Sequence, residues 1–320
     1  MALAWLASLT LGPRPLLAAH LSAPATQAGA SASVSVPSGT KANATLDGAR
    51  IQPPTQQTAR KLAPAQPATT KDRRSSNQLI DARALIGTYF GMRHGESIPS
   101  SQQRVCSSMA AGIDPRNGLT ERGREEVKRN SEAWLQANAP AINLALKRGQ
   151  LLILSSPFSR SRESAELLAA TIESWWQASP GGSVSGSRVS GSRVASSTPV
   201  RRPPIRIEPD LRERDFGSFE GQSPSGPIYR HVWDQDSLDP HGQPWGVESA
   251  AAVQRRATAL IQRIERQSQG HPERIVVLVS HGDTLKILQT GFQQQTPSAH
   301  QDPARVEPFR TAETRGSQLR

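Results

Sequence analysis

The 320-residue chain holds a single cysteine, Cys106, and few aromatic residues, which make up 4% of the sequence. One cysteine excludes an internal disulfide and any zinc site built from several thiolates. The seven histidines include no pair at the helical spacing that metal ligands use, so we expect no metal. No apolar run reaches the roughly 18 residues that a membrane-spanning helix needs. These absences disfavour disulfide-stapled, zinc-dependent and membrane-spanning proteins.

Hydrophobic residues are also scarce. They make up 36% of the chain, below the roughly 45–50% that is usual for globular proteins, so part of the sequence is expected to lack a core. The net charge of +11 is uneven, because residues 1–75 contribute +6 and residues 178–204 contribute +4, which leaves +1 for the rest. A nearly neutral folded part offers no basic face, so a nucleic-acid partner is not expected.

Two tracts differ in composition from the rest. Residues 1–75 are rich in Ala, Ser, Thr and Pro and have no acidic residue before Asp47, which predicts a disordered or targeting segment. A chloroplast or mitochondrial transit peptide is favoured over a secretory signal, because no positive charge precedes the apolar stretch LAWLASLTL. Plain disorder in a cytoplasmic protein is the alternative. Residues 179–204 contain the near-repeat SGSRVSGSRV and predict an exposed insertion loop.

Strand and helix patterns alternate along the remaining sequence. Strands are expected at residues 86–92, 151–155, 205–208 and 274–280, and helices at 120–137, 160–177, 248–267 and 284–292. This alternation predicts an α/β fold, a three-layer α/β/α sandwich with a largely parallel central sheet. In such folds the ligand lies beyond the carboxyl ends of the strands.

Polar residues follow three of the expected strands. Arg93 and His94 follow the first strand, Arg160 lies just beyond the second, and His281 follows the last. Because the carboxyl ends of parallel strands meet at one edge of the sheet, we expect these residues to converge. Residues 211–217 add acidic side chains in a loop that contains glycine. Two histidines, two arginines and an acid are suited to phosphoryl transfer.

Five stretches also carry a family resemblance. They are RHGES (93–97), GLTERG (118–123), SSPFSRSRESAELL (155–168), LRERDFGSFEG (211–221) and VSHGDTLK (279–286). In residues and in order they resemble the histidine phosphatase superfamily, in its phosphoglycerate mutase-like branch, over residues 86–292. The resemblance implies a phosphoglycerate mutase-like fold, with residues 76–320 as the catalytic domain, and phosphatase chemistry without a metal or cofactor.

The resemblance implies a role for each matching residue. His94 would attack phosphorus as a neutral imidazole and form a phosphohistidine. Arg93 and Arg160 would grip the phosphoryl oxygens, since a guanidinium matches their geometry and charge. His281, when protonated, would donate to the charge that develops in the transition state. Glu213 would protonate the leaving oxygen and then deprotonate water, a role that requires a raised pKa and partial burial.

Other residues of these motifs leave alternatives open. Ser100 stands where many family members carry a phosphate-binding asparagine, and its hydroxyl is predicted to bind phosphate in place of the amide. Gly95 is expected to let the backbone turn close to the phosphate. Glu96, Ser97 and Asp283 are candidates for loop hydrogen bonding alone. The rival acids to Glu213 are Glu208, Asp210, Asp215 and Glu220.

The predicted function is that of a metal-independent phosphomonoesterase acting on a phosphorylated small molecule or a phosphoprotein. Residues 98–117 lack the tryptophan and phenylalanine pattern of cofactor-dependent phosphoglycerate mutases, which favours a phosphatase over a mutase. The alternatives are mutase-type phosphoryl transfer and a phosphate-binding protein without activity on the same fold, because a fold alone does not establish activity.

Overall fold

A computed structural model of the chain describes residues 80, 85–179, 202–223 and 228–316. The chain divides into units of residues 1–64 and 65–320, and all described residues belong to the second unit. The predicted leading tract, residues 1–75, lies outside the described residues, as does most of the predicted insertion at 179–204. Both therefore stay predictions.

A five-stranded sheet forms the centre of the fold. Its strands are β1 (Thr88–Arg93), β2 (Leu151–Ser155), β3 (Ile205–Ile207), β4 (Ile275–Ser280) and β5 (Thr314–Gly316). They lie in the order β3-β2-β4-β1-β5. The first four are mutually parallel, whereas β5 pairs antiparallel with β1 at one edge. The prediction of a largely parallel sheet is confirmed.

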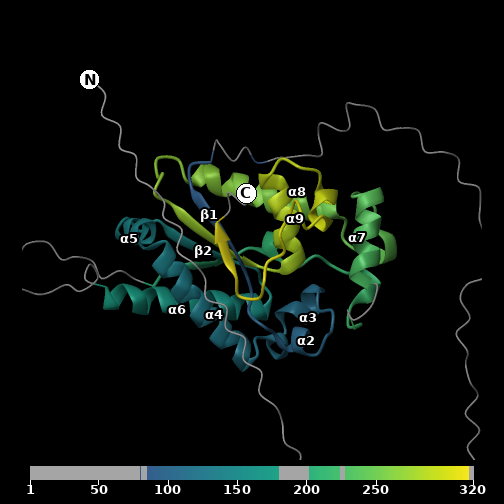
Figure 1. The fold of residues 1–320 in the computed structure, drawn as a ribbon, viewed down its shortest axis with the longest axis horizontal. Helices are drawn as coiled ribbons and strands as arrows, with labels where there is room; N and C mark the ends of the chain where they lie inside the picture. Colours follow the sequence, from purple (N-terminus) through teal and green to yellow (C-terminus); the bar gives the residue numbers. More distant parts are fainter. Residues whose placement is uncertain (1–79, 81–84, 180–201, 224–227, 317–320) are drawn as a thin grey trace, which may run out of the picture. The chain divides into compact units, whose positions relative to one another are not determined.

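Helices cover both faces of this sheet (Figure 1). One face packs against α4 (Glu121–Ala137), α5 (Ala139–Lys147) and α6 (Ser159–Ala178), and the other packs against α8 (Ala250–Gln267) and α9 (Gly282–Phe292). The shorter helices are α2 (Ile98–Ser101), α3 (Met109–Ile113) and α7 (Ile228–Leu238), together with five 3₁₀ segments among the described residues: Pro115–Asn117, Pro209–Leu211, Gly217–Phe219, Pro244–Gly246 and Pro297–Gln301. The chain thus has the predicted three-layer α/β/α architecture.

Side-chain alternation explains the two-sided packing. In β4, Val277 belongs to the cluster on the α4–α6 side, and Val276 and Leu278 belong to the cluster on the α8–α9 side. Every residue of β4 is buried. A central parallel strand covered on both faces is expected to be apolar throughout, and IVVLVS is apolar up to its last residue.

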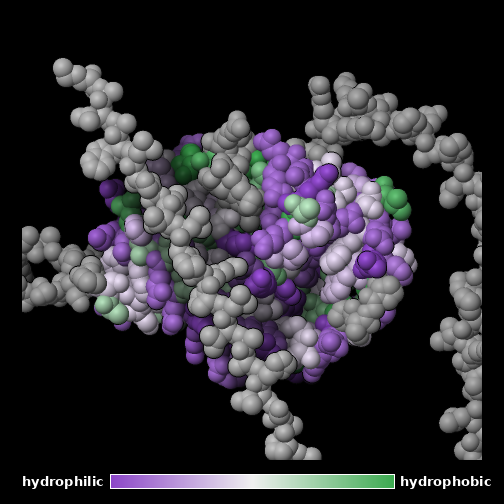
Figure 2. All heavy atoms as spheres, in the orientation of Figure 1, coloured by the Kyte–Doolittle hydropathy of each residue, from purple (hydrophilic) through white to green (hydrophobic). Residues whose placement is uncertain are grey.

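Two of the long helices, α4 and α8, begin at side-chain caps. Thr120 accepts a hydrogen bond from the backbone of Gly123 and begins α4, as the sequence predicts. Ser249 caps α8, so this helix begins at Ala250 and not at residue 248. No helix in the described part of the chain is long and apolar enough to cross a membrane. The face in Figure 2 is mostly hydrophilic where grey atoms do not cover it.

Candidate active site

The candidate site lies at the carboxyl edge of the sheet, where β1 leads into His94 and β4 leads into His281. A cleft of about 80 Å³ opens there. Its lining comprises Arg93, His94, Ser97, Pro99, Ser100, Arg104, Val105, Cys106, Ser107, Arg160, Glu213, Phe216 and Tyr229. Five of the six predicted site residues therefore line one cleft, and the sixth, His281, lies directly beside it, with its ring centroid 5.1 Å from that of His94.

The hydrogen bonds of His94 assign its tautomer. Its Nδ1 lies 2.7 Å from the carbonyl oxygen of Gly95, which can only accept, so Nδ1 carries the proton. Its Nε2 accepts a hydrogen bond of 3.1 Å from Nε of Arg160 and so carries the lone pair. Burial, reinforced by Arg160 and Arg93, holds the pKa of His94 well below its usual value. The imidazole is neutral, as nucleophilic attack requires.

Arg160 is the second residue of α6. It is only 4% exposed, so it is not a solvated residue of the first helical turn. Its Nη2 donates to the carbonyl oxygen of Cys106 at 2.9 Å, and its Nη1 lies 3.6 Å from the sulfur. Burial lowers its pKa. Among the described residues it forms no ion pair within 4 Å, and a buried charge without a counter-ion is costly. A bound anion would supply the missing partner.

Arg93 is fixed by the segment that leads into β5. Its Nη1 donates to the carbonyl oxygen of Phe309 at 2.9 Å, and the backbone nitrogen of Ala312 donates to the carbonyl oxygen of His94 at 3.1 Å. The Nε of Arg93 is buried and has no partner among the described residues. Arg93 therefore keeps a donor free at the edge of the cleft.

His281 is fully buried beside His94. Its Nε2 lies 2.8 Å from Oγ of Ser156 and 3.3 Å from Oγ of Ser161. Ser156 Oγ already accepts from the backbone nitrogen of Phe158, so its own proton is available for Nε2. Its Nδ1 is buried without a partner in the described part of the chain. Burial, and next the positive charge of Arg160, hold the pKa of His281 well below its usual value. The imidazole of His281 is therefore neutral in the free protein.

Glu213 has the properties that a general acid requires. It is partly buried, and its Oε1 accepts three hydrogen bonds, from the backbone nitrogen of Arg214 (2.9 Å) and from the nitrogen (3.2 Å) and hydroxyl (3.1 Å) of Thr284. Its Oε2 accepts none within the described residues. Burial raises its pKa, and the negative charge of Asp283 raises the pKa further.

The rival acids are engaged elsewhere. Glu208 and Asp210 form ion pairs with Arg263 at 2.7 and 3.4 Å. Asp215 accepts from the backbone nitrogen of the second residue after it at 2.8 Å. Glu220 Oε2 accepts from two backbone nitrogens and a hydroxyl in the segment before α3. Glu213 is thus the one carboxylate that lines the cleft in the described part of the chain.

Gly95 packs closely against α4. A Cβ on Gly95 would lie 2.4 Å from the carbonyl oxygen of Gly123 in α4, and a Cβ on Gly123 would lie 2.0 Å from the carbonyl oxygen of Glu96. Glycine is therefore required at both positions because the loop after His94 packs backbone against backbone on α4. The expected approach of Gly95 to the phosphate stays a prediction.

Ser100 lines the cleft, but its hydroxyl is already used. It donates to the carbonyl oxygen of Ser97 at 2.8 Å and accepts from the nitrogen of Ser97 at 2.8 Å, which together with the Ser97 side chain forms the capping box of α2. A phosphate contact from Ser100 would have to break this cap and stays a prediction. Glu96 accepts from the hydroxyl of Thr120 at 2.8 Å and is a loop hydrogen-bonding residue here.

Several lining residues carried no sequence signal. Arg104 reaches the cleft with its Nη2 bonded to Oδ1 of Asn117 at 2.8 Å, and it follows no strand and belongs to no motif. Tyr229 is the second residue of α7, close to a gap in the described chain, and its ring packs on Phe216. Burial raises the pKa of its hydroxyl. Only the tertiary fold brings these side chains to the cleft. No cluster of three metal-ligating side chains is present among the described residues.

A buried neutral histidine lies at the carboxyl edge of a largely parallel sheet, beside two arginines that form no ion pair within the described residues. This arrangement suits the handling of phosphoryl groups. The family model described as "Histidine phosphatase superfamily (branch 1)" matches residues 194–315. This range includes Glu213 and His281, whereas His94 and Arg160 precede it. This part of the chain is similar to the histidine phosphatase superfamily, a likeness that supports a phosphatase or, more generally, phosphoryl transfer.

Comparison with solved structures gives weaker likenesses. "Mycobacterial hydrolase 1" shares 20% identity over 72% of this chain and 88% of its own, with a TM-score of 0.49. A mycobacterial glucosyl-3-phosphoglycerate phosphatase shares 20% over 72% and 89%, with a TM-score of 0.48. YhfR of Bacillus stearothermophilus shares 23% over 71% and 87%, with a TM-score of 0.44. These likenesses carry no information on the substrate. No curated protein matches the chain.

Proposed function

We propose that the protein is a metal-independent phosphomonoesterase that acts through a phosphohistidine on His94. One observation carries the proposal: Nε2 of His94 presents a lone pair inside a cleft whose buried arginine, Arg160, has no carboxylate partner among the described residues. A nucleophile beside an unpaired guanidinium is arranged for a phosphate ester. The proton on Nδ1, held by the Gly95 carbonyl, fixes the ring for attack.

In the first step a phosphate ester dianion draws the guanidinium donors of Arg160 and Arg93 onto its equatorial oxygens, which releases the lone pair of His94. The Nε2 lone pair attacks phosphorus in line, and the P–O ester bond breaks with its electron pair going to the leaving oxygen. Glu213, whose pKa is raised by burial, gives its proton to that oxygen. Nδ1 of His281 has no partner among the described residues, and when it carries a proton it would donate to a phosphoryl oxygen.

In the second step water attacks the phosphohistidine. The Glu213 carboxylate takes one proton from the water as the O–P bond forms, and the P–N bond breaks with its electron pair returning to Nε2 of His94. The products are inorganic phosphate and the starting enzyme. Arg93 and Arg160 hold the same three oxygens throughout, so they stabilise both transition states.

The test is rapid-mixing capture of phosphate bound to the protein, with p-nitrophenyl phosphate in EDTA. Wild type should show an acid-labile, base-stable phosphoenzyme, and His94→Ala should show none while its turnover falls by roughly 10⁴- to 10⁶-fold. Phosphate binding should survive in His94→Ala through the arginines. Equal labelling of His94→Ala and wild type would refute His94 as the nucleophile.

A parallel assay separates the phosphatase from a mutase. With 3-phosphoglycerate and 2,3-bisphosphoglycerate, the proposed enzyme should release inorganic phosphate and should not interconvert phosphoglycerate isomers. Isomer interconversion faster than phosphate release would overturn the hydrolase assignment. Absence of any phosphoenzyme or turnover in wild type, with retained phosphate binding, would leave a binding protein.

A further inference from the structure

Two neighbouring residues of one loop bind two neighbouring residues of one helix. The loop is residues 212–216, here called the acid loop, and the helix is α9. Glu213 accepts from the backbone and hydroxyl of Thr284, while the next residue, Arg214, donates to Oδ2 of Asp283 at 3.3 Å. The orientation of the Glu213 carboxyl is therefore tied to how Arg214 is held.

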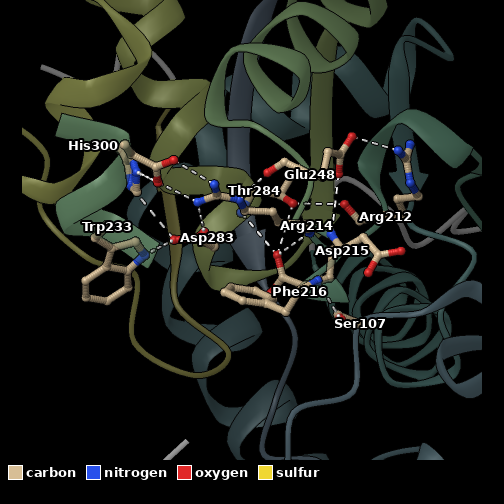
Figure 3. Close-up of polar contacts among 12 residues, drawn as sticks. Ser107, Arg212, Arg214, Asp215, Phe216, Trp233, Glu248, Asp283, Thr284 and His300 are labelled. Atoms are coloured by element: carbon tan, nitrogen blue, oxygen red, sulfur yellow. Dashed lines mark hydrogen bonds and ion pairs between the residues drawn. The ribbon is translucent and has the colours of Figure 1, made fainter. Parts of the chain in front are cut away.

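Arg214 is held more firmly than any surface ion pair could hold it. It is 1% exposed, and its Nη1 and Nη2 donate to the two carboxylate oxygens of Asp236 in α7 at 2.6 and 2.7 Å. Its Nε donates to the carbonyl oxygen of Glu248 at 2.7 Å. Figure 3 shows the guanidinium of Arg214 between Asp283 on one side and Glu248 on the other. The fork geometry fixes the direction of the side chain as well as its charge.

Further side chains hold the two carboxylates in turn. The indole nitrogen of Trp233 donates to Oδ1 of Asp283 at 3.1 Å, and Nε2 of His300 lies 3.0 Å from Oδ2 of Asp236. The contact between Trp233 and Asp283 appears at the left of Figure 3. The network joins α7, α9 and the segment before α8 to the acid loop. Arg214 itself does not line the cleft.

A buried ionic network of this kind is an inefficient way to stabilise a fold. Taking several charges out of water costs free energy that apolar residues of similar size would not cost. Fixing geometry is what such networks do best in the cases where their role is known. The residue before Arg214 in the chain is Glu213, whose carboxyl would have to reach the leaving oxygen. The group whose position the network could fix is therefore the Glu213 carboxyl.

We propose that Arg214 is a positioning residue for Glu213. Its clamp between Asp236 and Asp283 holds the acid loop so that Oε1 of Glu213 stays on Thr284 and Oε2 stays free for the proton transfer. This inference rests on the proposed function. It assigns Arg214 to the proton-transfer step alone and not to phosphate binding or to attack by His94.

The experiment compares Arg214→Lys and Asp236→Asn with wild type on two substrates. Lysine keeps the charge but loses the two-pronged contact, and asparagine weakens the same contact from the α7 side. Ethyl phosphate needs protonation of its leaving oxygen, whereas p-nitrophenyl phosphate does not. Turnover of ethyl phosphate should fall roughly 10- to 100-fold, because a small misplacement of a catalytic group has about that effect. Turnover of p-nitrophenyl phosphate should stay within about threefold of wild type.

Two controls make the result specific. Arg263→Met removes an arginine that holds Glu208 and Asp210, ahead of the acid loop, and should lower neither activity selectively. In a Glu213→Gln background, Arg214→Lys should lower ethyl phosphate turnover no further, because the step that Arg214 serves is already lost. Thermal melting reports whether each variant folds.

The outcomes separate the two levels of inference. A selective and non-additive loss supports the positioning role. Equal loss on both substrates, an additive loss in the Glu213→Gln background, no loss, or failure of both variants to fold would overturn it in favour of a structural role. Wild type that hydrolyses neither substrate would overturn the proposed function first, and this inference with it.

Discussion

The contact between Gly95 and Gly123 predicts a loss of activity from a substitution outside the cleft. A Cβ at position 123 would lie 2.0 Å from the carbonyl oxygen of Glu96. A non-bonded carbon and oxygen stay at least about 3.0 Å apart. Helix α4 and the loop after His94 would therefore have to separate by about 1.0 Å. His94 lies two residues before Glu96 and would move with the loop.

The expected effect of Gly123→Ala follows from that displacement. A shift of about 1 Å in a catalytic group costs on the order of 100-fold in rate. Gly95→Ala requires a smaller separation of about 0.6 Å from the carbonyl oxygen of Gly123, and should cost on the order of 10-fold. Overpacking should also lower the free energy of unfolding by about 1–3 kcal/mol, or a few degrees in Tm.

The assay is kcat for p-nitrophenyl phosphate together with the melting temperature. Glu125→Ala, an exposed position on the same helix α4, is the matched control and should change neither quantity. The glycine variants should melt cooperatively below wild type and still turn over slowly. Gly123→Ala with wild-type kcat and Tm would refute the reasoning, because the clash could then relax without moving His94.

Further predictions concern pH, the cleft and the domain boundary. Because burial and Arg160 lower the pKa of His94, kcat/KM for p-nitrophenyl phosphate should not fall as the pH drops through 6.5, and an acid limb centred there would contradict this. His94 and His281 take up protons below about pH 6.5 in the unfolded chain but not in the folded protein. Below that pH, each histidine should therefore lower the free energy of unfolding by up to about 1.4 kcal/mol per pH unit, which denaturant melts would measure. Arg104→Met removes a guanidinium from the cleft and should raise KM roughly 10-fold with little change in kcat; an unchanged KM would exclude Arg104 from substrate binding. Deletion of residues 1–75 should leave kcat within about twofold, and an insoluble or inactive product would place the domain boundary wrongly.

Much of the fold was predictable from local pattern. The strand at 151–155 has the bounds that the sequence predicts, because five apolar or small residues stand between polar turns. The edge strand β5 (Thr314–Gly316) was not predictable, since three residues with two polar side chains show no period and pair only because β1 offers its edge. α5 escaped notice because Pro140 sits in its first turn, where proline is tolerated.

The candidate site divides in the same way. His94, Arg160 and Glu213 stand in motifs next to strand ends and could be found from sequence. Arg104 and Tyr229 could not, since neither follows a strand and only the folding of their segments over the cleft brings them there. The charge state of His281 was equally out of reach, because it depends on complete burial, which no spacing of residues encodes.

The contacts of residues 309–316 with β1 have a consequence for folding during synthesis. The contact of Arg93 with Phe309 and the pairing of β1 with β5 join positions separated by more than 200 residues of sequence. During synthesis from the N-terminus, the ribosome releases His94 long before the segment that braces it. Contacts between residues so far apart in the sequence form slowly and late in folding. We therefore expect the nascent chain to be inactive, and accessible to chaperones, until residues 309–316 have been synthesised.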